Sequence, residues 1–376
     1  MNIGVIGSGT MGIGISQVAS ANGCNVFLFD ANSSQTEKAL QNLKQTLTKL
    51  AEKQKISVEE SEQIFSRIKF CTTLQELKDS DLVIEAIIEN KEIKTKVFSE
   101  LEDYVSDTCI IGSNTSSISI TSLSSELKRP ERFIGIHFFN PAPLMPLVEI
   151  IPGLLTDEQL PQKVYDLMKT WKKVPVIAKD IPGFIVNRIA RPYYGEALRI
   201  VEENIATPQQ VDDAMTSLGN FKMGPFELMD LIGIDVNFAV TTTVYKDYFY
   251  DPKYKPSLLQ QRMAEAKLLG RKTGRGFYNY QEGAVKSVAQ KDDALYENIF
   301  IRIISMLVNE AVEAKRLGIA SDEDIELAMQ KGVNYPKGLL SWGQEIGYKI
   351  ISETLQNLYN KYQEERYRQS PLLSKI

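Results

Sequence analysis

The sequence predicts a doubly wound α/β domain followed by a helical domain that is repeated in tandem. Three observations support this prediction. Apolar, strand-like runs alternate with helical patterns in the first half of the 376-residue chain, as in open α/β sheets. A glycine-rich turn joins the first strand to the first helix. From about residue 181 onward helical patterns dominate, and one stretch of them recurs at a fixed spacing.

A short apolar strand leads into a glycine motif and then into a helix. The motif is Gly7-Ser8-Gly9-Thr10-Met11-Gly12. Gly7 permits the tight turn, Gly9 lets the backbone approach a pyrophosphate, and Gly12 lets the helix pack closely on the strand. We expect Gly7, Gly9, Thr10, Met11 and Gly12 to contact a dinucleotide. The motif therefore predicts a Rossmann-like domain.

A second strand ends in an acid, Asp30. A carboxylate at this place binds the adenosine ribose hydroxyls and repels a 2′-phosphate, so Asp30 favours NAD over NADP. The alternative is a residue that only caps the strand end.

The rest of this domain follows from periodicity. A helix predicted over residues 33–54 has one apolar stripe, formed by Leu40, Leu43, Leu47 and Leu50, and a lysine-rich face that includes Lys53. A second helix, over 58–68, completes a helical excursion at 33–70. Strands are predicted at 81–86, 108–113 and 175–179, with a helix at 91–105. These elements place the first domain at residues 1–180.

The chain has a single histidine, His137, which follows a predicted strand at 133–136. Open α/β sheets bind ligands at the carboxyl ends of their strands, and histidine exchanges protons near neutral pH. The next apolar run carries Glu149. A core histidine and a strand-edge glutamate are the alternative, but downstream of the glycine motif the pair favours catalysis. Ser116 follows another strand, in a serine cluster whose alternative role is helix capping.

Composition limits the function classes. A net charge of −5 argues against a general nucleic-acid binder and against adsorption to an anionic membrane. The three cysteines, Cys24, Cys71 and Cys109, lack metal-ligand spacing, so we expect no metal site and a reducing compartment. The N-terminus has no signal-peptide pattern, and no apolar run is long enough to span a bilayer. We therefore expect a cytoplasmic protein.

The helical half contains an internal repeat. Residues 196–233 recur without a gap 114 residues later, at 310–347. The first copy's matched residues include Glu196, Ala197, Ala214, Met215, Asn220, Gly224 and Gly233, and the second copy's include Glu310, Ala311, Ala328, Met329, Asn334, Gly338 and Gly347. We expect one helical domain at 181–285 and its second copy at 286–376. The basic, glycine-rich segment 270–278 is either a flexible tether or a phosphate-contacting loop.

Several of these segments together resemble the L-3-hydroxyacyl-CoA dehydrogenases of fatty-acid β-oxidation, including 3-hydroxybutyryl-CoA dehydrogenases. Besides the glycine motif they are Val83-Ile84-Glu85-Ala86 with Glu89-Asn90, Ser113-Asn114-Thr115-Ser116-Ser117, His137-Phe138-Phe139-Asn140-Pro141, Pro182-Gly183-Phe184-Ile185-Val186-Asn187-Arg188, Met223-Gly224-Pro225-Phe226-Glu227 and Gly274-Arg275-Gly276-Phe277-Tyr278. The resemblance implies a Rossmann-like domain followed by all-helical domains like the C-terminal domain of 6-phosphogluconate dehydrogenase.

The resemblance also implies a reaction, the NAD-dependent oxidation of an (S)-3-hydroxyacyl-CoA to the 3-oxoacyl-CoA. The catalytic residues of the family fall on His137, Glu149, Ser116 and Asn187. Its NAD contacts fall on Asp30, Glu89, Lys94, Ser116, Asn140 and Lys272. Its substrate contacts fall on Thr46, Lys53, Ser116 and Asn187, with Thr46 standing where the family usually has serine.

The chain departs from single-function members of that family, which end near residue 285 in this numbering. We expect the added second copy to pack against the first as an internal pseudo-dimer, which predicts a monomeric chain; a homodimer is the alternative. Two other functions share these motifs. One is an NAD-dependent dehydrogenase of a free hydroxy or sugar acid, such as L-gulonate, and the other is a non-catalytic, crystallin-like NAD-binding protein.

Overall fold

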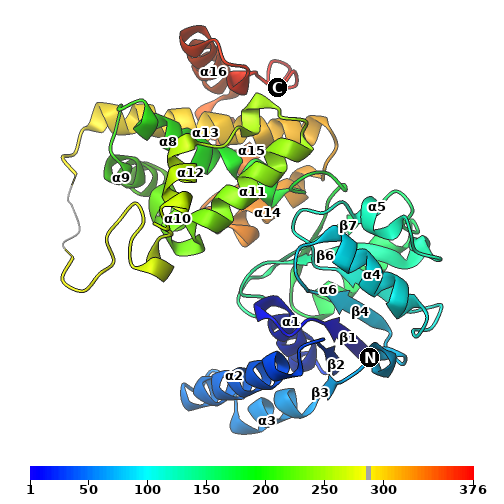
Figure 1. Ribbon diagram of the computed structural model, residues 1–376. Coiled ribbons are helices and arrows are strands. Elements are labelled where there is room, and N and C mark those ends of the chain that lie inside the picture. The colour runs from blue at the N-terminus through cyan, green and yellow to red at the C-terminus, as the bar shows by residue number, and fades with distance from the viewer. Residues whose placement is uncertain (285–288) are drawn as a thin grey trace. The chain divides into compact units, whose positions relative to one another are not determined.

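The computed structural model describes residues 1–284 and 289–376 and divides into two units, Met1–Ile181 and Pro182–Ile376 (Figure 1). Unit 1 is α/β, and the described part of unit 2 consists of helices and loops. The predicted boundary between the two helical copies, at residues 285 and 286, lies outside the described residues.

Unit 1 is built on an eight-stranded sheet with the order β3-β2-β1-β4-β5-β6-β7-β8. The strands are β1 (Asn2–Ile6), β2 (Asn25–Phe29), β3 (Ile68–Cys71), β4 (Leu82–Glu85), β5 (Ile110–Ser113), β6 (Phe133–Phe138), β7 (Leu147–Pro152) and β8 (Val174–Ile177). Only β6 and β7 pair antiparallel; every other neighbouring pair is parallel. The strand order reverses between β1 and β4, which is where such sheets bind dinucleotides.

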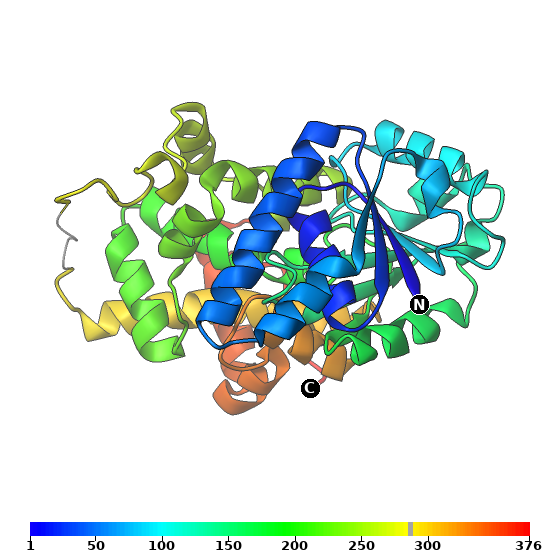
Figure 2. The same ribbon diagram turned by 90° about the horizontal axis from the view of Figure 1, so that it is seen from below.

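Helices pack around this sheet. They are α1 (Thr10–Ala21), α2 (Ser33–Glu52), α3 (Val58–Ser66), α4 (Lys91–Glu102), α5 (Ile120–Ser124) and α6 (Leu160–Thr170), with short 3₁₀ turns η1 (Leu74–Leu77) and η2 (Pro130–Arg132). Figures 1 and 2 show α2 and α3 side by side, as the predicted excursion. The leucine stripe of α2 is confirmed: Leu43 and Leu47 are buried in the core, and Leu40 and Leu50 pack against it.

Some predicted bounds differ from the structure. The helix predicted over 58–68 ends at Ser66, because Ile68 and the residues after it pair in parallel with β2 as strand β3. That pairing is long-range, so no helical or strand period revealed it. The helical pattern of residues 185–203 predicts a single long helix, but the structure has two helices there, α7 (Val186–Ile189) and α8 (Arg191–Glu202). Pro192 lacks the N–H that would continue the helical ladder.

The described part of unit 2 contains two copies of one helical arrangement. After α7 and α8 the first copy contains α9 (Pro208–Gly219), α10 (Pro225–Ile232), α11 (Ile234–Asp247), η3 (Pro252–Tyr254), α12 (Leu258–Glu265) and η4 (Arg271–Thr273). The second contains α13 (Asp293–Arg316), α14 (Asp322–Gly332), α15 (Leu339–Ile346), α16 (Tyr348–Tyr362) and η5 (Glu365–Tyr367). Helix α13 corresponds to α7 and α8 joined, since Met306 stands where the first copy has Pro192.

Local details repeat at the same spacing. Asn220 and Asn334 both adopt the left-handed conformation, with φ of 54° and 55°. The carboxylate of Asp212 accepts from the first amides of α10, and the carboxylate of Glu326, 114 residues later, accepts from the first amides of α15. In each copy this side chain satisfies amides that a helix leaves without an internal partner.

The basic segment between the copies is a folded loop rather than a tether. Asp230, at the end of α10, accepts from the backbone amides of Phe277 and Tyr278 and from the hydroxyl of Tyr280. A Cβ on Gly276 would lie 2.0 Å from the Asp230 carboxylate, so the loop approaches α10 too closely for any larger residue.

In the described ranges, no helix has the length and apolarity needed to cross a bilayer. The same residues contain no cluster of histidine, cysteine, aspartate and glutamate suited to a metal ion.

Candidate active site

The antiparallel pairing of β6 with β7 places His137 directly opposite Glu149. The Nδ1 atom of His137 lies 2.7 Å from Oε2 of Glu149. Both residues are buried, with His137 only 6% exposed and Glu149 0%. An ionised carboxylate can only accept a hydrogen bond, so Nδ1 carries the proton and the neutral ring has its lone pair on Nε2. The pair therefore provides a proton acceptor of fixed tautomer.

Neighbouring contacts restrict this imidazole further. The ring of Phe139 packs on it, with 4.5 Å between the ring centroids. The backbone N–H of Phe138 donates to the side-chain oxygen of Asn114 at 2.8 Å, which connects the end of β6 to the polar loop after β5. Asn140 is exposed in the turn that follows β6. The loops after β5 and β6 thus meet at one edge of the sheet.

The loop after β5 binds a carboxylate from the loop after β4. Oε1 of Glu89 accepts from the Thr115 hydroxyl at 2.6 Å and from the Ser116 amide at 2.9 Å. The Ser116 hydroxyl lies 3.3 Å from the same oxygen. The alternative role for this serine cluster is helix capping. In the structure the N-cap of α5 is Ser119, whose side chain accepts from the Ser122 amide. Ser116 instead belongs to the polar group around Glu89.

Lys94 supplies the counter-charge from α4. Its side chain is 1% exposed, its Nζ donates to Oε1 of Glu85 at 2.5 Å and lies 3.3 Å from Oε2 of Glu89. Partial desolvation disfavours the charged form of Glu89, whose side chain is still 37% exposed, but the Lys94 charge and the hydrogen bonds of the β5 loop outweigh it and lower the pKa of Glu89. Glu89 is therefore a held anion at this edge of the sheet.

Sequence reasoning assigned no role to Glu85 or Ser8. Glu85 is 0% exposed and accepts from Lys94, from the Ile87 amide at 2.6 Å and from the Ser113 hydroxyl at 2.7 Å, so it is the buried anchor of Lys94. The feature of the sequence that could have revealed Glu85 is an acidic residue at the end of an apolar strand. Ser8, in the glycine motif, donates to Asp30 Oδ2 through both its amide and its hydroxyl, at 2.7 and 2.8 Å.

The glycine motif has the geometry that its spacing predicted. Gly7 has a φ of 105°, which only glycine adopts readily, and a Cβ on Gly12 would lie 1.8 Å from the Gly7 carbonyl oxygen. A Cβ on Gly9 would meet nothing within 4 Å. Thr10 and Met11 begin α1, and in this described stretch no side chain caps the helix and no acid lies in its first turn. A helix start with open amides suits a phosphate, so the residues present fit a dinucleotide.

The predicted coenzyme A contacts, Thr46 and Lys53, are exposed on α2 and at its C-cap. They are seven residues apart, about two helical turns, and so share one face. The Thr46 hydroxyl donates to the Asn42 carbonyl oxygen at 2.8 Å.

Two predicted residues belong to unit 2. Asn187 is half-buried on α7. Lys272 pairs with Asp235, its Nζ lying 2.6 and 2.7 Å from the two carboxylate oxygens.

Comparison with known families matches both units. The family model described as 3-hydroxyacyl-CoA dehydrogenase, NAD binding domain, matches residues 2–181. The model described as 3-hydroxyacyl-CoA dehydrogenase, C-terminal domain, matches two segments, residues 183–280 and 299–376. Both helical copies therefore contain a segment that matches the same domain model.

Individual relatives agree with these matches. The chain is 35% identical to 3-hydroxyadipyl-CoA dehydrogenase of Escherichia coli strain K12, over 99% of this chain and 96% of that protein. It is 43% identical to 3-hydroxybutyryl-CoA dehydrogenase of Clostridioides difficile, over 75% of this chain and 100% of that protein. Its structure is similar to the crystal structure of 3-hydroxybutyryl-CoA dehydrogenase from Escherichia coli K12, with a TM-score of 0.94, 34% identity and coverage of 100% and 98%.

Substitutions at two glycines of the motif distinguish an effect on protein stability from an effect on cofactor binding. Because a methyl group at residue 12 would collide with the Gly7 carbonyl, we expect Gly12→Ala to lower the free energy of unfolding by about 1–3 kcal/mol. Gly9→Ala meets no protein atom, so its unfolding free energy should stay within about 0.5 kcal/mol of the wild type. Its methyl group would face the approaching pyrophosphate, so NADH should bind more weakly. Urea unfolding and NADH fluorescence titration measure the two effects; unchanged NADH affinity in Gly9→Ala would contradict the assignment.

Proposed function

Because the chain belongs to the 3-hydroxyacyl-CoA dehydrogenase family, we propose that it catalyses the reversible, NAD-dependent oxidation of an (S)-3-hydroxyacyl-CoA to the 3-oxoacyl-CoA. The observation that carries this proposal is the 2.7 Å contact between His137 and Glu149, on adjacent strands of a dinucleotide-binding fold. A structural protein of the crystallin kind would not need a buried, charge-assisted histidine pair.

The chemistry assigns a role to each side chain. A secondary alcohol releases hydride readily only as its hydroxyl proton is removed, and Nε2 of His137 is the base that removes it. The Glu149 carboxylate stabilises the resulting imidazolium, and in the reverse direction the same nitrogen returns the proton. NAD, when bound, supplies the hydride acceptor, held by the glycine motif and Asp30. By the family resemblance, Glu89, Lys94, Asn140 and Lys272 would supply further contacts to NAD.

Two further polar groups would hold the substrate. The Ser116 hydroxyl and the Asn187 amide are suited to donate to the reacting oxygen or to the thioester carbonyl. Hydrogen bonds to an oxygen that gains negative charge contribute most when they are held in place beforehand. The bond from the Ser116 amide to Glu89 restrains this residue, and the Ser116 hydroxyl, whose single proton is directed at Glu89 at 3.3 Å, would turn to donate to the substrate.

One assay separates this proposal from its alternatives. The purified protein should oxidise NADH with acetoacetyl-CoA and should show little reduction of NAD with L-gulonate. The opposite preference would support a free sugar acid as substrate, and no turnover with either would support a non-catalytic protein. Relatives named for hydroxybutyryl and hydroxyadipyl substrates differ at the acyl end, so a series of 3-oxoacyl-CoA chain lengths should follow.

Removing the base should abolish most of the turnover. We expect His137→Ala to lower kcat with acetoacetyl-CoA by about 10²–10⁴-fold, because a positioned acid/base contributes that much. Glu149→Gln should lower it in the same direction, since a neutral amide stabilises imidazolium less. NADH affinity serves as the control and should not change in either variant. Turnover near the wild-type value in His137→Ala would refute the mechanism.

Recognition of coenzyme A is proposed to involve Thr46 and Lys53 on α2. The adenosine 3′-phosphate needs a local cation, and lysine serves phosphate as a flexible point charge. We expect Lys53→Glu to raise the KM for acetoacetyl-CoA, and salt to raise it in the wild type. Lys38→Glu, at the other end of α2 and about 22 Å away along the helix axis, is the matched control and should leave KM nearly unchanged. Equal KM values in the two variants would assign Lys53 to a solvated face.

We also propose that the chain is a monomer whose two helical copies form an internal pseudo-dimer. Helix α8 of the first copy packs on α13 of the second. The aromatic rings of Phe221 and Tyr335, which occupy equivalent places in the repeat, lie with 5.0 Å between their centroids. Such self-complementary contacts are typical of two-fold interfaces, and a tethered copy competes at a concentration on the order of millimolar.

Sedimentation equilibrium tests this association. The full chain should sediment as one 42.3 kDa species. Truncation after Tyr280 exposes the apolar face that the second copy covers, so the truncated protein should dimerise or aggregate. A truncated protein that stays monomeric and soluble, with no gain in binding of a hydrophobic dye, would argue against the pseudo-dimer.

A cytoplasmic location remains part of the proposal. Its support is that Cys24, Cys71 and Cys109 are all buried free thiols, as expected for a reducing compartment.

A further inference from the structure

The helical turn that carries Asn187 is short. Helix α7 spans only Val186–Ile189, and one residue, Ala190, lies between it and α8. The chain enters α7 through Gly183 and Phe184, both with positive φ. A single helical turn has too few internal hydrogen bonds to be stable by itself. Its orientation therefore depends on the side chains that anchor it.

Arg188, the residue after Asn187, is a charged anchor of this turn, beside Arg191 of α8, whose Nε donates to the Asn187 carbonyl oxygen at 2.7 Å. Its side chain is 3% exposed, and its Nε donates to the Tyr254 hydroxyl at 3.0 Å. The same nitrogen lies 3.5 Å from Oε2 of Glu310, and the guanidinium stacks over Tyr248 at 5.2 Å. Glu310 is on α13, so an anchor of the Asn187 turn comes from the second copy.

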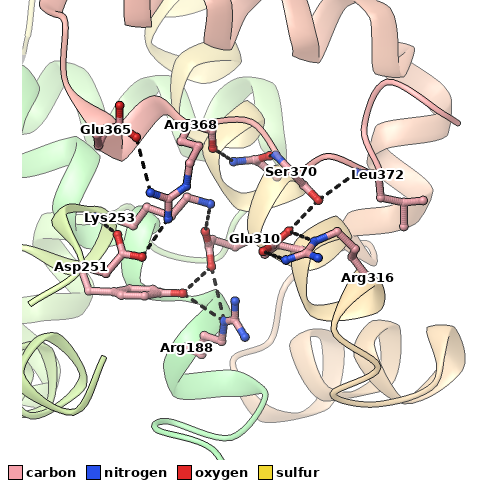
Figure 3. Close-up of polar contacts among 12 residues, drawn as sticks. Arg188, Asp251, Lys253, Glu310, Arg316, Glu365, Arg368, Ser370 and Leu372 are labelled. Carbon is pink, nitrogen blue, oxygen red and sulfur yellow. Dashed lines mark hydrogen bonds and ion pairs between the residues drawn. The ribbon is translucent and has the colours of Figure 1, made fainter. Parts of the chain in front are cut away.

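Glu310 is a buried carboxylate surrounded by donors of the first copy. Figure 3 shows it between Arg188 and Lys253. Lys253 Nζ donates to its Oε1 at 3.0 Å and the Tyr254 hydroxyl to its Oε2 at 2.8 Å. Burial disfavours the charge on Glu310, but Lys253 and Arg188 outweigh it and hold the pKa of Glu310 below its ordinary value.

The repeat contains the same contact in reverse. Arg302 and Glu196 occupy the places that correspond to Arg188 and Glu310, and they pair with Nε 2.5 Å from Oε1. Tyr367 donates to Glu196 at 2.8 Å, as Tyr254 does to Glu310. Each copy thus holds the arginine of the other. The two contacts differ in the residue that precedes the arginine. Asn187, which has a polar amide, precedes Arg188, whereas the apolar Ile301 precedes Arg302.

From this asymmetry we infer that Glu310 of the second copy is a positioning residue for catalysis, which acts through Arg188 to hold Asn187 in place. The inference rests on the proposed function, and in particular on the contact of Asn187 with the substrate. The second copy, which lacks the asparagine, then helps to position a substrate contact that the first copy carries. The reciprocal pair of Arg302 with Glu196 has only a packing role.

The matched variants are Glu310→Gln and Glu196→Gln. Each replaces a buried carboxylate that pairs with an arginine of the other copy, and the two glutamates are 2% and 1% exposed, so both variants should lose thermal stability, although Arg302 keeps a second carboxylate, Glu203. Only Glu310→Gln should lower kcat with acetoacetyl-CoA, by about 10- to 100-fold, because small displacements of a positioning group cost that much. Its KM for NADH should not change. Glu310→Asp, which keeps the charge, should recover part of the lost kcat and serves if the glutamine variant does not fold.

A double-mutant cycle shows whether the effect passes through Asn187. If it does, Asn187→Ala combined with Glu310→Gln should have the kcat of Asn187→Ala alone. Independent, multiplying losses, or equal losses of kcat in Glu310→Gln and Glu196→Gln, would overturn the inference, as would a normal kcat in both. Failure of the proposed function is distinguishable, because the wild type would then not turn over acetoacetyl-CoA at all.

Discussion

The antiparallel pairing of β6 with β7 is the constraint on which the candidate site depends. In an otherwise parallel sheet it returns the chain beside the strand it has just left, so two residues twelve positions apart face each other. A slip of one residue would turn Glu149 to the opposite face of the sheet. Both strands are almost wholly buried, and a slip would separate the buried Glu149 carboxylate from His137, so the pairing of these two side chains favours the observed register. The tautomer of His137, and hence the nitrogen available for proton transfer, follows from that register.

A second constraint acts around the buried charges of the same sheet edge. Lys94 is nearly inaccessible to solvent, and a buried ammonium ion is stable only when it is paired. Glu85 and Glu89 pair with it, and Glu89 in turn binds the loop that carries Ser116. The positions of the loops after β4 and β5 are therefore coupled, and the bond from the Phe138 amide to Asn114 adds the end of β6. This coupling gives the proposed cofactor and substrate contacts of unit 1 a defined geometry before any ligand binds.

In unit 2, contacts between the two helical copies restrain buried charged side chains in a similar way. A two-fold interface between identical chains repeats each contact, and the tandem copies reproduce this with the exchanged pairs of Arg188 with Glu310 and Arg302 with Glu196. Once the copies share one chain, their sequences are free to diverge. The second copy has isoleucine at residue 301 and no proline at 306, so α13 is a continuous helix, whereas in the first copy Pro192, in the first turn of α8, interrupts the helical hydrogen bonds and the Asn187 turn is a separate element. After this divergence the second copy keeps the packing contacts, and the first copy keeps the polar amide of Asn187.

Much of this protein was determined by the sequence alone. The glycine motif, the leucine stripe of α2, the candidates His137 and Glu149 and the 114-residue repeat all follow from local spacing and periodicity, which depend on residues close together in the chain. Only the tertiary structure decided that β3 is a strand, that Glu85 anchors Lys94, that Ser116 binds Glu89 and that Glu310 holds Arg188. These features join segments distant in sequence, and buried charges find partners only when the packing of whole elements brings them within a few ångströms.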